Sequence, residues 1–327
     1  MPTAENALLQ YEGGQTAIAM AALTDTGDHT IFTAAGSPWS GKSGSEALVL
    51  ANGLLTGAAT IPAVSGSDDV VDVAALTSNF NGEENISVSG SVDVAVTRGS
   101  VNGYMVNSVT LNAAKTIVVV AGTESTSFSE VRGAAGGPPY IPIDSIELAQ
   151  VRLTSISAGP VLANEVNDTI GLHREMSFNP VFSTSNAQGR VTFASALPAI
   201  HTGDVAKGVQ ASYSTPVFAD VALATEFVPP ENSHSVTSTQ VYRSTIGSTA
   251  KTLNQGTFTA FLLDGVTDAL VGLKDENLWF KFFPDQFKTP YILTQGILGI
   301  SRTFPADDSI QAACTVSAEE EASENVS

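Results

Sequence analysis

The stretch Ile86-Ser-Val-Ser-Gly-Ser-Val-Asp-Val-Ala-Val-Thr97 alternates apolar and polar residues over twelve positions. A period of two residues is typical of a β-strand that has one buried face and one hydrated face. Gly90 lies near the middle and predicts a bend or bulge, because glycine weakens a regular strand. The stretch therefore predicts a β-fold in this part of the chain.

Strand-like runs separated by Gly, Pro, Asn and Asp continue in both directions from this stretch. Residues 116–121 form a continuous apolar run, which suits a strand covered on both faces. Other runs of this kind occupy residues 108–111, 146–153, 190–193, 209–213, 217–223, 235–242, 256–263, 292–295, 297–303 and 310–317. We therefore expect an all-β protein with little helix.

Three segments leave the local structure open. Residues 275–283 are densely apolar and suit either a strand or a short helix that ends at Pro284. Residues 45–51 also suit a helix or a strand. Asp204 could cap a single helical turn over residues 204–207.

The domain organisation is predicted from weak stretches in the 327-residue chain. Residues 133–142 are rich in glycine and proline, which disfavours regular structure there. Residues 155–160 form a second weak stretch, so we place a domain boundary near residue 160. This divides the chain into an N-terminal β domain (1–160), a C-terminal β domain (161–318) and an acidic tail (319–327) that we expect to be irregular unless a neighbouring subunit holds it.

The charge balance excludes some classes of partner. The chain has 33 acidic and 14 basic residues and a net charge of −19, and residues 1–97 contain only one basic residue, Lys42. This balance disfavours binding to nucleic-acid phosphates or to an anionic membrane surface. The sequence also has no apolar run of membrane-spanning length and no basic residue before its first apolar stretch, so we expect neither a membrane span nor a secretory signal.

Metal and catalytic chemistry find little support in the sequence. The single cysteine, Cys314, and four scattered histidines predict no disulfide and no metal site. His201 and Asp204 could orient an imidazole, but no nucleophile motif accompanies them. The paired carboxylates at 68–69, 83–84 and 307–308 are interpreted as exposed turn charges. We predict no enzyme activity, no catalytic residue and no cofactor.

A phosphate-loop pattern is present at Gly36-Ser-Pro-Trp-Ser-Gly-Lys-Ser43. It matches G-x-x-x-x-G-K-[ST], in which Gly36, Gly41, Lys42 and Ser43 would hold a nucleotide. The following sequence has no alternation of strands and amphipathic helices, and the surrounding segment is acidic. We therefore interpret the pattern as a decoy and predict a surface loop with Trp39 tucked under it.

An aromatic cluster follows at Trp279, Phe280, Phe282, Phe283, Phe287 and Tyr291. Aromatic side chains dominate both cores and subunit interfaces, so these are the favoured interpretations. A sugar-binding platform is the alternative. The interface candidates are Trp279, Phe280, Phe282, Phe283, Gly296, Gly299 and Arg302, and the two glycines also predict a bulge or a close approach of two backbones.

Two stretches resemble proteins of bacteriophage tails. Residues 289–317 resemble the end of the major tail tube proteins of long-tailed, siphovirus-type phages, where a glycine-bearing strand, a Pro/Asp turn and a last strand follow one another. Residues 109–153 are similar to a β module of phage tail and fibre proteins, in which an apolar strand ends at a glycine (here Gly122) and a proline-containing loop follows. Together the two stretches cover roughly a quarter of the chain.

The resemblance implies a structural role. Subunits of this family have a two-sheet β-sandwich or barrel and form hexameric rings that stack into a tube, with a long loop and the chain ends between rings. The N-terminal β domain would then decorate the tube or bridge rings. The partners would be further copies of the chain and other tail proteins, and the chain would be made in the host cytoplasm and located in the virion tail.

The acidic balance fits this role, because a wall bearing carboxylates would let DNA pass through the lumen without binding. The charge could instead serve only to keep the free subunit soluble. The alternative functions are a tail fibre, spike or capsid decoration protein, or a carbohydrate-binding β module.

Overall fold

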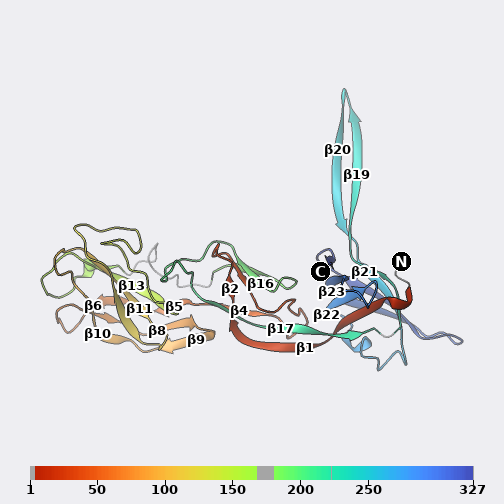
Figure 1. The fold of residues 1–327 in the computed structure, drawn as a ribbon, viewed down its shortest axis with the longest axis horizontal. Helices are drawn as coiled ribbons and strands as arrows, with labels where there is room; N and C mark the ends of the chain where they lie inside the picture. Colours follow the sequence, from red (N-terminus) through yellow and green to blue (C-terminus); the bar gives the residue numbers. More distant parts are fainter. Residues whose placement is uncertain (1–3, 168–179, 222, 327) are drawn as a thin grey trace. The chain divides into compact units, whose positions relative to one another are not determined.

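The computed structural model describes residues 4–167, 180–221 and 223–326 and confirms the predicted all-β fold with little helix (Figure 1). Helix in the described ranges is limited to three short 3-10 segments: η1 (Ala4–Asn6), η2 (Ala163–Glu165) and η3 (Val271–Leu273). No helix in these ranges is long and apolar enough to cross a membrane.

The chain forms two compact units, and both are discontinuous in sequence. Unit 1 contains residues 1–18, 36–47 and 213–327, and unit 2 contains residues 19–35 and 48–212. The boundary predicted near residue 160 is therefore wrong. Residues 155–159 belong to unit 2, where the Arg98 guanidinium donates to the carbonyls of Ser155 (3.2 Å) and Gly159 (3.1 Å).

One antiparallel sheet contributes most of its residues to unit 1. Its strands follow the order β18, β21, β24, β23, β22, β1 and β17. In that order their bounds are Ala224–Val228, Gly256–Phe261, Gln311–Ser317, Tyr291–Thr303, Asn277–Phe283, Leu8–Ala22 and Val209–Asp220. The segment that could have been a helix or a strand before Pro284 is thus the strand β22.

Alternation along these strands produces the core of unit 1. Leu278 and Phe280 on β22, Leu298 on β23 and Cys314 on β24 are buried in one apolar cluster. Trp279 lies between the two β22 core residues in sequence, so its side chain points to the other face. The period of two that predicted strands from the sequence therefore also separates the two faces of the sheet.

The C-terminal residues extend this sheet. β25 (Ser323–Asn325) pairs with Tyr291–Leu293 of β23, and β24 pairs with Ile297–Thr303 of the same strand. The prediction of an irregular acidic tail is wrong for these residues. After β24 ends, the first half of β23 still offers a free edge, and the tail completes its hydrogen bonding. The glutamates at 319, 320, 321 and 324 are nevertheless exposed.

A separate two-stranded hairpin in unit 1 consists of β19 (Asn232–Val241) and β20 (Ser244–Leu253), drawn in cyan in Figure 1. All ten residues of each strand are paired across the hairpin. Within the described residues neither strand has a second neighbour. The sequence predicted the first strand, but β20 was missed.

Three sheets of unit 2 surround a second apolar core. They are β12–β11–β13–β14, β10–β7–β6 and β5–β8–β9. Their strands, in chain order from β5 to β14, are Gly53–Gly57, Thr60–Pro62, Val70–Val73, Leu76–Phe80, Glu83–Val88, Ser91–Ala95, Met105–Leu111, Ile117–Ala121, Ile146–Leu153 and Val166–Asn167.

Two predictions about these strands need correction. The alternating stretch around Gly90 is not one bent strand, because β9 and β10 belong to different sheets. A Cβ on Gly90 would lie 2.5 Å from the Val73 carbonyl oxygen, so only glycine fits where the chain changes sheets. The apolar run in β12 forms an edge strand and is only half-buried, whereas every residue of β11 is buried.

The remaining strands of unit 2 form a small sheet in the order β15, β16, β3 and β2. In that order their bounds are Phe182–Ser185, Arg190–Phe193, Ile31–Thr33 and Thr24–Asp25. Phe193 packs edge-on against Phe32 and Phe182, with ring centroids 5.5 and 5.8 Å apart. β4 (Leu48–Ala51), the other segment of open structure, is a strand paired with the start of β17.

Candidate functional site: interaction surfaces of the chain

The phosphate-loop pattern forms a loop of unit 1 that is built around Trp39. This side chain is fully buried, stacks on Tyr213 with ring centroids 4.9 Å apart, and donates from Nε1 to the Gly36 carbonyl (3.1 Å). The predicted surface loop with a tucked tryptophan agrees with this geometry. The indole Nε1 of Trp279 donates to the Trp39 carbonyl at 2.7 Å, which fixes the loop on β22.

The backbone N–H groups of this loop face carboxylates, whereas those of a phosphate site face a bound phosphate. The backbone N–H of Ser43 donates to the Glu276 carboxylate at 3.2 Å, and that of Gly44 donates to Glu46 at 2.8 Å. The segment after the pattern, up to β4, is not helical, so no helix N-terminus points at the loop. The carboxylates that already accept hydrogen bonds from these N–H groups would repel a phosphate group.

The aromatic candidates on β22 divide into two groups. Trp279 and Phe280 are buried, with 3% and 0% of their surface exposed; Phe280 belongs to the apolar cluster of unit 1, and Trp279 is buried on the other face of the sheet. Because it is buried, Trp279 cannot form part of a sugar-binding platform. Neither Trp279 nor Phe280 presents its side chain for a subunit interface. Phe282 and Phe283 are half-buried and contact Phe227 and Tyr291, with ring centroids 4.9 and 5.5 Å apart.

Lys281 lies among the same aromatic rings. Its ammonium is 4.0 Å from the Tyr291 ring centroid and 4.8 Å from that of Phe283. Burial lowers the pKa of Lys281. The rings thus stabilise a cation of the same chain.

The two glycine candidates on β23 lie against β24 where a Cβ atom has no room. A Cβ on Gly296 would lie 2.8 Å from the carbonyl carbon and oxygen of Ser317. A Cβ on Gly299 would lie 2.3 Å from the Thr315 hydroxyl oxygen. The close approach of two backbones predicted from the sequence is therefore present at Gly296, against β24 of the same chain, whereas a side chain fills the space at Gly299.

Replacing Gly296 by alanine is expected to lower the free energy of unfolding by about 1–3 kcal/mol, because backbone atoms of β24 cannot yield to a new methyl group. Gly272→Ala is the matched control, since no atom lies within 4 Å of its Cβ position. Urea unfolding followed by fluorescence measures both variants. Equal stability of the two would show that β24 moves aside without cost.

Arg302 extends from the end of β23 to a neighbouring loop. Its guanidinium donates to the Gly265 carbonyl and lies 6.0 Å from the centroid of the Phe304 ring. Arg302 therefore positions the loop after β21 against the turn between β23 and β24.

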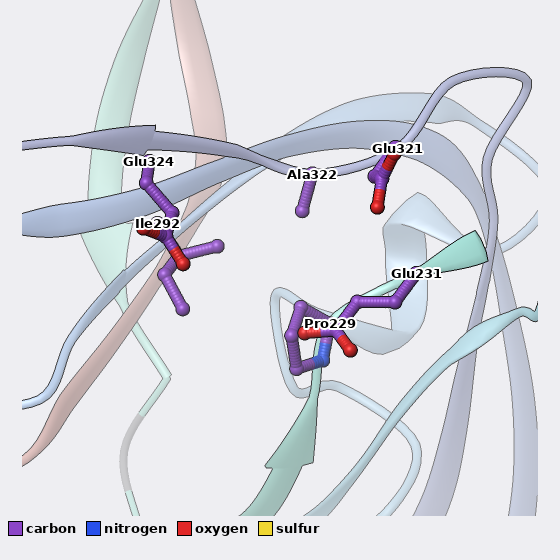
Figure 2. Close-up of a pocket in the computed structure, with 6 residues that line it drawn as sticks. All are labelled: Pro229, Glu231, Ile292, Glu321, Ala322 and Glu324. Atoms are coloured by element: carbon purple, nitrogen blue, oxygen red, sulfur yellow. The ribbon is translucent and has the colours of Figure 1, made fainter. Parts of the chain in front are cut away.

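The root of the hairpin is held by the C-terminal segment. The Asn232 side-chain amide donates to the Glu321 carboxylate at 2.5 Å, and this hydrogen bond is the main reason why the pKa of Glu321 is lowered. The N–H of Ala322 donates to the Pro230 carbonyl at 3.0 Å. Figure 2 shows the adjoining pocket of about 210 Å³, which is lined by Pro229, Glu231, Ile292, Glu321, Ala322 and Glu324.

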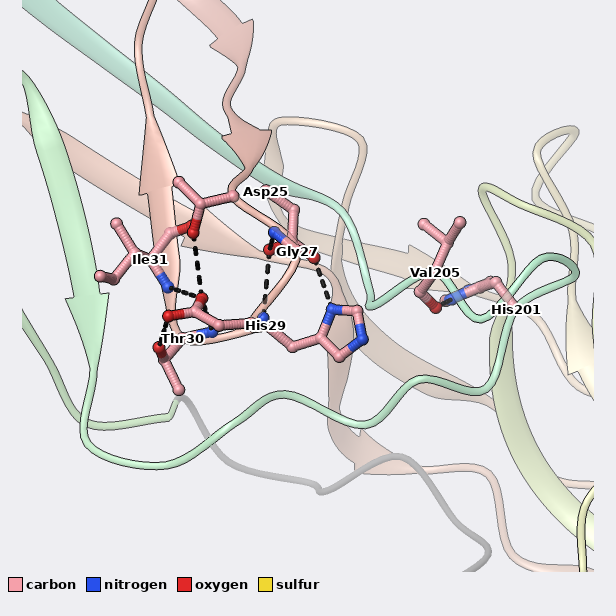
Figure 3. A network of polar contacts seen from close by, with 9 residues as sticks. Asp25, Gly27, His29, Thr30, Ile31, His201 and Val205 are labelled. Carbon is pink, nitrogen blue, oxygen red and sulfur yellow. Dashed lines mark hydrogen bonds and ion pairs between the residues drawn. The ribbon is translucent and has the colours of Figure 1, made fainter.

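The side chains of His29 and His201, both shown in Figure 3, hold neighbouring loops in place. The Asp25 carboxylate accepts from the backbone N–H of Gly27 (2.9 Å) and lies 2.6 Å from Nδ1 of His29, which closes a tight loop. His201 is buried and its ring nitrogens face the carbonyls of Val205 (3.2 Å) and Ser145 (2.9 Å). The pairing with Asp204 considered from the sequence is absent from these contacts.

Metal-ligating residues do not gather in the part of the chain that the structure describes: no group of three or more His, Cys, Asp or Glu side chains could hold an ion there. Cys314 is buried, and burial raises the pKa of its thiol to about 12. A thiol with so high a pKa is a poor nucleophile.

No protein-family model matches the chain. No curated protein matches it either.

Proposed function

We propose that the chain is the structural subunit of a bacteriophage tail tube, in which six copies form a ring and rings stack around a channel that DNA passes through. The resemblance of residues 289–317 to major tail tube proteins suggested this role. In this proposal the protein acts in the virion tail and binds further copies of itself and other tail proteins. It has no substrate and no cofactor.

The β19–β20 hairpin is the observation that carries the proposal. A lone two-stranded hairpin is at best marginally stable in water. This one has ten paired residues in each strand, and both of its outer edges lack a neighbour in the described chain. Long open edges without proline or dense charge invite pairing with another chain. A polymer of identical subunits supplies that second chain at every hairpin.

The charge of the chain supports passage of DNA. With 33 acidic against 14 basic residues, an assembled wall would repel phosphates over a distance of about 8 Å at physiological salt. Few cations would be available to displace counterions from DNA and hold it. A carbohydrate-binding module is disfavoured because Trp279, the aromatic residue proposed for its platform, is buried.

Shortening the hairpin tests the role of this element. Residues 234–251 would be replaced by Asn-Gly, a pair that forms two-residue hairpin turns and can join Ser233 to its cross-strand partner Thr252. This design keeps the Asn232–Glu321 contact. We expect an unchanged free energy of unfolding but loss of tubes, because the removed residues contact mainly each other. Tubes of normal length from the shortened chain would contradict the role of the hairpin.

Sedimentation velocity over a concentration series tests ring formation. The full chain should show a discrete species of six times the 33.7 kDa subunit, followed by larger species as rings stack. A fibre or spike protein would stop at a trimer. A single 33.7 kDa species at every concentration would exclude assembly of the free protein.

A further inference from the structure

The tip of the hairpin presents two residues to solvent. Tyr242 and Arg243 form the two-residue loop between the last cross-strand pair, Val241 and Ser244, and the Tyr242 side chain is completely exposed. Arg243 has φ +66°, a left-handed conformation that hairpin and type II turns usually reserve for Gly or Asn. Tyrosine and arginine are among the residues that most often dominate protein–protein binding energy.

The hairpin differs in charge from the rest of the chain. Residues 232–253 contain none of the 33 acidic residues and two of the basic ones, Arg243 and Lys251. Lys251 is close enough to Glu321 at the root to contribute to lowering the pKa of that carboxyl. Arg243 therefore places the only full positive charge at the tip, and the tip should favour an acidic partner.

An exposed apolar patch lies elsewhere in unit 1. We call it the loop patch and define it by Leu263, Val266 and Phe304, whose side chains are 92%, 67% and 57% exposed. The first two belong to the loop after β21, and Phe304 begins the turn between β23 and β24. The loops touch, because a Cβ on Gly265 would lie 2.7 Å from the Phe304 ring and 3.0 Å from Ile310.

Carboxylates lie in both loops of the loop patch. Asp264 and Asp268 lie within its first loop, and Asp307 and Asp308 are exposed in its second. The Thr267 hydroxyl and backbone N–H groups donate to Asp264 and lower its pKa to about 2, so this carboxyl stays ionised and holds the loop in shape. Arg302, at the end of β23, already donates to the Gly265 carbonyl. An apolar centre with an acidic rim complements an exposed aromatic ring beside a cation.

We propose that Tyr242 and Arg243 of one copy dock on the loop patch of a second copy of this chain. The Tyr242 ring would cover Leu263 and Phe304, and Arg243 would face Asp307 and Asp308. Because the two surfaces differ, each copy can bind one neighbour through its tip and another through its patch. Such head-to-tail contacts generate open helical assemblies when they do not close into a ring. This inference rests on the proposed tube in taking the second copy to be a subunit of the next ring.

Reversing the charges of the proposed partners by substitution in the full chain tests the contact. Arg243→Glu and the double variant Asp307→Lys/Asp308→Lys should each weaken self-association in sedimentation by about tenfold or more. The chain that carries all three changes should regain association. Lys115→Glu is the control, because it changes the net charge as Arg243→Glu does, at an exposed ion pair with Glu83. An equal loss in the control, or no recovery in the triple variant, would overturn the proposal.

A photo-crosslinking amino acid at position 242 locates the partner directly. We expect a crosslinked dimer with the bond in residues 262–268 or 303–310 of the second chain. Crosslinks mapped elsewhere, or confined to one chain, would overturn docking. If Arg243→Glu formed normal tubes, the docking proposal would be refuted and the tail tube proposal would still stand. The expected crosslink in a protein that forms no tubes would support docking and refute the tube.

Discussion

Replacing Arg132 by alanine is expected to lower the free energy of unfolding of unit 2 by about 3–5 kcal/mol, because it leaves a buried carboxylate without its cation. Glu147 on β13 has no exposed surface, and its carboxylate is 2.6 Å from the Arg132 guanidinium. Ser108 on β11 donates to the same carboxylate at 2.6 Å. Arg132 also donates to the Pro139 carbonyl and so fastens the glycine-rich loop to the sheet.

The loss caused by Arg132→Ala should depend on pH. Burial raises the pKa of Glu147, and the charge of Arg132 opposes that rise. Without Arg132 the pKa should rise further, so the variant loses most stability where the carboxyl is ionised. The difference from the parent protein should therefore shrink as the pH falls below this raised pKa. A loss that grows towards acidic pH would contradict this explanation.

The control for this variant is Lys115→Ala, which removes an exposed ion pair with Glu83 and should cost less than about 1 kcal/mol. Urea unfolding followed by circular dichroism measures both variants. Both tryptophans of the chain belong to unit 1, so fluorescence follows that unit alone. A fluorescence transition unchanged by Arg132→Ala would locate the loss in unit 2.

Replacing Trp39 by alanine is expected to destabilise unit 1 by about 3–5 kcal/mol, the usual cost of deleting a large buried aromatic side chain. The change removes the stack on Tyr213 and leaves a cavity beneath the loop. It keeps the backbone carbonyl that accepts from Trp279, so the loss reports packing. Trp279 remains as the fluorescent probe of urea unfolding.

Trp39→Phe is the matched variant, because it keeps a ring against Tyr213 and should recover much of the stability lost in Trp39→Ala. If Trp39→Ala unfolded at the same urea concentration as the parent, the loop would not contribute to the core. If unit 2 lost as much stability as unit 1, the two units would unfold as one.

The local sequence pattern was sufficient to predict many of the strands. Strand-like runs located β23 and β24, and the lack of a following helix identified the loop around Trp39 as something other than a phosphate site. The sequence left β22 open between a strand and a short helix. Burial of β12 and the boundary of the units were mispredicted, because both depend on which distant strands pair. β11 gains a neighbour on each side, so it is central and β12 is at the edge.

The hairpin was only half found, for a physical reason. Short hairpins are recognised by Asn-Gly or Asp-Gly at the turn, and this one turns on Tyr242 and Arg243. Its second strand is rich in Ser, Thr and Gly and buries no apolar face that would mark it. The loop patch was also missed, since the loops that carry Leu263 and Phe304 come together only when β21 and β24 pair.

Electron microscopy of the concentrated full chain tests the central claim most directly. The tail tube proposal predicts hollow tubes with six-fold symmetric cross-sections and an open central channel. Isolated globular particles at every concentration, with no rings and no tubes, would contradict it.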